Sequence, residues 1–99
     1  MSGGSYDYAY DRAEDMADRL IEYSKDPLRI AFAKHLKQVA QAMHDIEWVD
    51  SGDYGEGREE ESIKAVLGEH WKEITITEVL EQIYEIRDQI VNLVMEEVE

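Results

Sequence analysis

Apolar residues recur at helical spacing through the middle of the chain, from residue 26 to residue 49. Steps of three and four residues place them on one face of an α-helix. This apolar stripe consists of Leu28, Phe32, Leu36, Val39, Met43 and Ile46. Asp26 and Pro27 suit the N-cap and first position, because a carboxylate accepts from free N–H groups and proline has none to satisfy. Alanines lie near the stripe at Ala31, Ala33, Ala40 and Ala42. We therefore expect this helix at the centre of a bundle.

The same period predicts helices on both sides of the central one. The expected helices cover residues 8–24, 26–49, 58–67 and 75 onwards. A residue that precedes proline is biased away from helical conformation, so the break before Pro27 predicts a tight antiparallel hairpin. Three glycines break the chain between residues 50 and 57, and Gly68 is the expected stop of the short helix. Thr75 and Glu78 match the capping box that begins a helix.

The last helix has the broadest apolar surface. Its main seam alternates steps of three and four, as in a coiled coil, and consists of Ile76, Val79, Ile83, Ile86, Ile90 and Leu93. A second stripe consists of Leu80, Tyr84, Val91, Val94 and Val98. So wide a surface needs more than one partner helix. Either the bundle covers both stripes, or another subunit covers one, and the main seam is the candidate oligomer interface.

These elements predict an all-α fold, a small helical bundle of three long helices and one short helix that could dimerise through the C-terminal helix. Residues 1–5 are expected to be a flexible N-terminus and residues 6–99 a single helical domain. The chain has no cysteine, so disulfides and thiolate chemistry are excluded. No apolar run could span a bilayer, and the first residues, MSGGS, lack a signal core. We expect a cytoplasmic protein.

The charge changes this picture, because the chain carries a net −14 that is unevenly spread. Residues 26–49 are neutral, whereas residues 50–73 carry −5 and residues 74–99 carry −6. A surface of this kind repels nucleic acid and anionic membranes and attracts basic protein surfaces. The alternative is that the acidity serves solubility alone.

Aromatic and acidic residues gather around the glycine-rich loop. Trp48 and Trp71 each flank a loop, and aromatic residues beside acids make usable contact surfaces. The candidate partner-binding residues are Trp48, Asp50, Asp53, Tyr54, Glu56, Glu59, Glu60 and Glu61. The alternative is that the tryptophans seal the end of the bundle.

Metal and catalytic motifs are incomplete. Counted from Asp50, Gly55 and Glu61 match two further anchors of an EF-hand loop, but Gly52 and Tyr54 stand where carboxylates are needed. A weak cation site of Asp50, Asp53 and Glu56 is an alternative to a flexible acidic loop. His44 and Glu47 share a helical face and could hold a transition metal, or His44 could simply be half-buried beside an acid. We predict no catalytic residue, no metal and no cofactor.

Two alternatives involve nucleotides. Glu78, Glu81, Glu85 and Asp88 form two E-x-x-E/D pairs, as in Mg-dependent all-α nucleoside triphosphate pyrophosphatases, but they share one helix. A small-nucleotide-binding sponge could stack a base on Tyr8, Tyr10 or Trp48. Phosphate groups would fit such a site only if Arg12, Arg19, Lys25 or Arg29 gather in one pocket.

Residues 35–57, HLKQVAQAMHDIEWVDSGDYGEG, resemble small acidic proteins encoded by bacteriophages and prophages. Such proteins often bind and block a host enzyme or a defence complex, and some mimic the charge of nucleic acid. The resemblance implies an inhibitor that docks on a basic, nucleic-acid-binding surface in the cytoplasm of a bacterial host. The expected partners are that protein and further copies of the chain, with no direct binding to nucleic acid or membrane.

Overall fold

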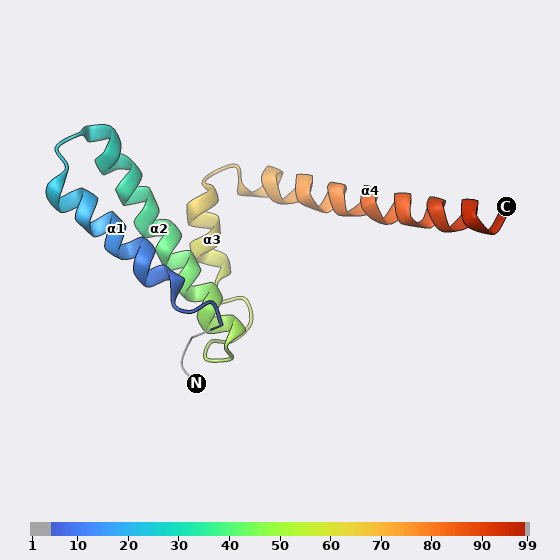
Figure 1. Cartoon of the computed structure of the whole chain (residues 1–99), viewed down its shortest axis with the longest axis horizontal. Helices are drawn as coiled ribbons and strands as arrows, with labels where there is room; N and C mark the ends of the chain where they lie inside the picture. Colours follow the sequence, from blue (N-terminus) through green and yellow to red (C-terminus); the bar gives the residue numbers. More distant parts are fainter. Residues whose placement is uncertain (1–4, 99) are drawn as a thin grey trace. The chain divides into compact units, whose positions relative to one another are not determined.

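The computed structural model describes residues 5–98 of the chain and contains four helices and no strand among them (Figure 1). These helices are α1 (Ala9–Tyr23), α2 (Pro27–Asp50), α3 (Glu60–Leu67) and α4 (Trp71–Val98). The all-α prediction with three long helices and one short helix is confirmed. The predicted flexible N-terminus falls largely outside the described residues, since only Ser5 of it is described.

The chain divides into two compact units, Met1–Gly68 and Glu69–Glu99. Helices α1, α2 and α3 belong to the first unit, and α4 belongs to the second. Within the first unit, α2 packs against both α1 and α3. The prediction of a central helix that begins at the Asp26–Pro27 pair is therefore confirmed for this unit.

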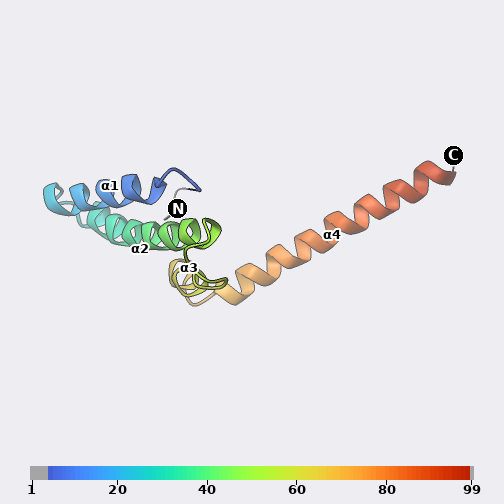
Figure 2. The ribbon, with the colours of Figure 1, turned by 90° about the horizontal axis from the view of Figure 1, so that it is seen from below.

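Helices α1 and α2 form the predicted antiparallel hairpin and lie side by side in both views (Figures 1 and 2). The Ser24 N–H donates to the Leu20 carbonyl oxygen at 3.0 Å and closes the last turn of α1. The Asp26 carboxylate accepts from the Leu28 N–H at 3.0 Å, and Pro27 occupies the first turn. Local sequence chemistry thus fixes both ends of this connection.

Small side chains line the interior of the hairpin. Ala17 of α1 and Ala33 of α2 are fully buried, and Ala40 is 3% exposed. Leu28 and Phe32 are 77% and 54% exposed, so the first two residues of the apolar stripe do not contribute to the interior of the hairpin. Phe32 lies about 100° around the helix from Ala33. The alanine face allows the closest approach of the two backbones and turns the start of the stripe towards solvent.

Helix α3 packs on the C-terminal half of α2. It begins at Glu60, two residues after the predicted start, because Gly57 precedes it in a turn in which the Glu60 N–H donates to the Gly57 carbonyl oxygen at 3.1 Å. Gly68 ends the helix with φ of 83°, a conformation that favours glycine. The predicted stop is therefore confirmed.

Helix α4 begins at Trp71, four residues before the predicted capping box. The Thr75 hydroxyl donates to the Trp71 carbonyl oxygen at 2.7 Å, and the Thr77 hydroxyl donates to that of Glu73 at 2.9 Å. Both threonines therefore lie inside the helix, and the prediction of Thr75 as an N-cap is wrong. A threonine hydroxyl can bond to the preceding turn as well as to an N-terminus, so the motif does not distinguish the two positions.

Candidate interaction surfaces

An aromatic cluster forms where α1, α2 and the glycine-rich loop meet. His44 stacks on Trp48 with ring centroids 5.2 Å apart and meets the edge of Tyr10 at 4.8 Å. Tyr54 lies 5.6 Å from the Trp48 ring, and the Arg58 guanidinium lies 4.7 Å above Tyr54. These stacked rings hold the loop against α2.

Two aromatic residues of the predicted docking surface, Trp48 and Tyr54, belong to this cluster. Trp48 and Tyr54 are half-buried among neighbouring rings, and the buried Trp48 Nε1 has no hydrogen-bond partner among the described residues. This placement fits the alternative in which Trp48 seals the end of the bundle. The sequence did not predict that His44, Tyr10 and Arg58 belong to this cluster. The four-residue spacing of His44 and Trp48 is a usable signal for their contact.

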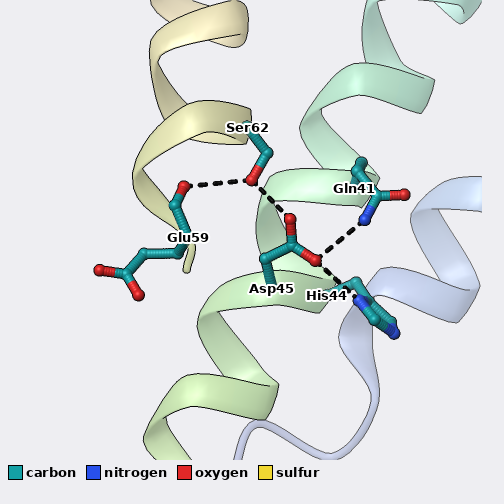
Figure 3. Close-up of polar contacts among 5 residues, drawn as sticks. All are labelled: Gln41, His44, Asp45, Glu59 and Ser62. Carbon is teal, nitrogen blue, oxygen red and sulfur yellow. Dashed lines mark hydrogen bonds and ion pairs between the residues drawn. The ribbon is translucent and has the colours of Figure 1, made fainter. Parts of the chain in front are cut away.

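A polar network centred on Asp45 joins α2 to α3 (Figure 3). The Ser62 hydroxyl donates to Asp45 Oδ2 at 2.7 Å and also lies 3.1 Å from the Glu59 carbonyl oxygen. Gln41 Nε2 donates to Asp45 Oδ1 at 2.9 Å, and His44 Nδ1 lies 3.0 Å from the same oxygen. Burial alone would raise the pKa of Asp45, but the bonds from His44, Ser62 and Gln41 outweigh it and lower the pKa below its ordinary value.

Replacing Ser62 by alanine is expected to lower the free energy of unfolding at neutral pH by about 1.5 kcal/mol, because the ionised carboxylate loses a donor. The lowered pKa means that Asp45 stabilises the fold above its unfolded pKa of about 3.9 and loses this effect as the pH falls through the folded pKa. The difference in the free energy of unfolding between Ser62→Ala and wild type should therefore become smaller as the pH is lowered. Urea unfolding at pH 7 and at low pH measures it, and Ser51→Ala serves as the control. A difference that does not change with pH would contradict the part assigned to Asp45.

Glu47 binds the segment that precedes α1. It is 1% exposed, and its Oε2 accepts from the backbone N–H groups of Tyr6 and Tyr8 at 3.0 and 2.9 Å. Asp7 and Tyr8 have φ of 55° and 56°. Alternate N–H groups of such a turn can converge on one anion, and here that anion is a side chain of the same chain. Glu47 therefore has a structural role, because it binds the backbone of the segment before α1.

The predicted acidic docking residues fall into two groups. Asp50 accepts a hydrogen bond from the Tyr6 hydroxyl, and this bond raises the pKa of Tyr6. Glu59 is half-buried, with its Oε2 buried and unbonded among the described residues. Asp50 is itself exposed, as are Asp53, Glu56, Glu60 and Glu61. The acidic surface therefore runs from the loop into the start of α3, and Glu59 is the one predicted acid that is half-buried.

The predicted oligomer-interface residues all lie on α4. Each residue of the main seam (Ile76, Val79, Ile83, Ile86, Ile90 and Leu93) is 48–64% exposed. The described residues of the second stripe (Leu80, Tyr84, Val91 and Val94) are 48–57% exposed. Both stripes predicted from the sequence are thus open faces of one helix.

Residues 5–98 contain no group of three or more histidine, cysteine, aspartate or glutamate side chains placed to hold a metal ion. Glu78, Glu81, Glu85 and Asp88 are exposed along α4. A hydrolase of the pyrophosphatase type would need carboxylates from a second copy to complete a magnesium site.

Comparison with family models, curated proteins and solved structures finds no match to this chain. Among the described residues, no helix combines the length and apolar character needed to cross a membrane.

Proposed function

We propose that this chain is a protein-interaction module that works without catalysing a reaction. The observation that carries the proposal is the surface of α4, where twelve large apolar side chains are 43–64% exposed. Single exposed apolar residues are ordinary, but a continuous apolar face of this length is typical of a contact with another protein. The partner that we assign to this face is a second copy of the chain.

The charges of α4 suit self-association. Its acids at Glu78, Glu81, Glu85 and Asp88 occupy heptad positions away from the main seam. The positions that flank the seam carry uncharged residues or Arg87 until Glu96 is reached. A second copy could therefore approach along the seam without setting carboxylates against each other, although α4 is acidic as a whole.

The exposed acids of the first unit form a second contact surface in this proposal. Asp53, Glu56, Glu60 and Glu61 would dock on a basic protein surface, and assembly through α4 would present several copies of this surface at once. The resemblance to phage proteins supports a host enzyme or defence complex as the target and the bacterial cytoplasm as the location. A basic surface that normally holds nucleic acid has the required charge.

The test is capture of a basic protein from bacterial lysate at low and high salt by wild-type chain and by two matched variants. In the loop variant, Asp53→Asn is combined with Glu56→Gln, Glu60→Gln and Glu61→Gln. The control variant removes the same number of charges from α4 by the substitutions Glu78→Gln, Glu81→Gln, Glu85→Gln and Asp88→Asn. Glu59 is kept in both variants, because its Oε2 is buried.

We expect wild type and the control variant to capture the same basic protein at low salt, with release at high salt, and the loop variant to lose it. Equal loss in both variants would mean that total charge, and not the loop, attracts the partner. Capture that survives both high salt and the loop variant would show that electrostatic docking is wrong.

A further inference from the structure

A groove at the closed end of the α1–α2 hairpin gathers basic residues in an otherwise acidic chain. Its volume is about 720 Å³, within the usual range for small-ligand pockets. It is lined by Arg19, Lys25 and Arg29, together with Asp15 and Asp26. Three cations against two carboxylates give the groove a local charge of +1, whereas the whole chain carries −14. Three of the four cations considered in the sequence analysis thus line one groove.

Both carboxylates of the groove are already engaged. Asp15 Oδ2 lies 3.1 Å from Arg19 Nε, which leaves the terminal nitrogens of that guanidinium outside this contact. Asp26 accepts from the Leu28 N–H as the cap of α2. No ion pair is assigned to Lys25 or Arg29 among the described residues. The groove therefore offers several N–H donors of the kind that bind phosphate oxygens.

The remaining lining is apolar and aromatic. Met16, Leu20 and Tyr23 line the groove, and Tyr23 is 76% exposed. A flexible thioether and an open phenol ring offer a surface on which a planar heterocycle can stack. The groove thus places stacking groups beside phosphate-binding groups.

We propose that this groove binds a small ligand that joins a planar ring to a phosphate group, the chemistry of a nucleotide. Arg29, Lys25 and Arg19 hold the phosphates, and Tyr23 stacks on the ring. This site lies on the hairpin and uses none of the acidic docking residues or of α4. It is independent of the proposed function.

The test is titration of the full chain with ATP, with inorganic pyrophosphate and with adenosine, each without divalent metal, followed by backbone amide NMR. ATP should shift the amides of Ser24, Lys25 and Arg29 and bind at least about tenfold more tightly than pyrophosphate or adenosine. Tyr23→Ala should weaken ATP and leave pyrophosphate unchanged. Arg29→Glu should weaken both about tenfold or more.

Lys34→Glu is the matched control, because it makes the same charge change at an exposed position of α2 that does not line the groove. It should leave ATP binding within about twofold of wild type, and circular dichroism should show that all variants fold. Equal weakening by Arg29→Glu and Lys34→Glu would overturn the site in favour of diffuse attraction. Absence of amide shifts with ATP in the millimolar range would overturn it outright.

Discussion

Replacing Ile86 by aspartate is expected to convert an oligomer into a monomer. Ile86 lies midway along the main seam of α4 and is 57% exposed in the single chain. Burial of such a side chain in an assembly contributes about 1.5–3 kcal/mol per copy. An aspartate there would instead bring unpaired charges together in an apolar contact, at a further cost of several kcal/mol. Sedimentation equilibrium measures the change in mass.

The helix content of α4 should fall when the assembly is lost. Ile86→Asp is therefore expected to reduce the helical circular dichroism signal, because tertiary packing supplies most of the stability of an amphipathic helix. The control is Asn92→Asp, which adds the same charge away from the main seam and should keep the mass of wild type. A wild-type chain that is monomeric at high micromolar concentration would overturn the assignment of α4 to self-association.

The width of the apolar surface on α4 bears on the number of copies. Isoleucine occupies the first heptad position throughout the main seam, and the fourth position holds Val79, Ile86 and Leu93. Because two of these three residues are β-branched, the pattern favours three or four strands over two. The second stripe, which includes Leu80 and Val94, can contact a further helix of such an assembly. The mass of wild type should therefore correspond to a trimer or tetramer.

The start of α2 and the end of α3 followed from local chemistry, but the packing face of α2 did not. Asp26, Pro27 and Gly68 act on their own neighbourhood, so their effects could be predicted from the sequence. The choice between the alanine face and the neighbouring apolar stripe depends on how close α1 approaches. A close approach satisfied by Ala17 and Ala33 leaves Phe32 exposed, and residue spacing alone does not decide between the two.

The candidate sites were predictable to a different extent. The exposed acids of the loop and both stripes of α4 follow from composition and period. The structural role of Glu47 does not follow from the sequence, because its partners are backbone N–H groups at Tyr6 and Tyr8, about forty residues away. Their convergence requires positive φ at Asp7 and Tyr8, and non-glycine residues in this conformation leave no clear sequence signature.

Replacing Glu47 by alanine is expected to release the segment before α1 and to destabilise the first unit. The N–H groups of Tyr6 and Tyr8 would lose their acceptor, and the positive φ of Asp7 and Tyr8 would lose the contact that holds it. The expected loss is about 2 kcal/mol, because buried polar groups that lose a partner cost about 1–3 kcal/mol. For a unit of this size, this lowers the melting temperature by roughly 10 °C.

Two comparisons identify the cause of that loss. Glu47→Gln keeps one carbonyl acceptor for the N–H groups, so it should fall between wild type and Glu47→Ala. Glu22→Ala removes an exposed glutamate from α1 and should leave the melting temperature nearly unchanged. Hydrogen exchange at the amides of Tyr6 and Tyr8 should accelerate in Glu47→Ala and remain slow in Glu22→Ala. If exchange at these amides is already fast in wild type, Glu47 does not bind the segment in solution and its burial needs another explanation.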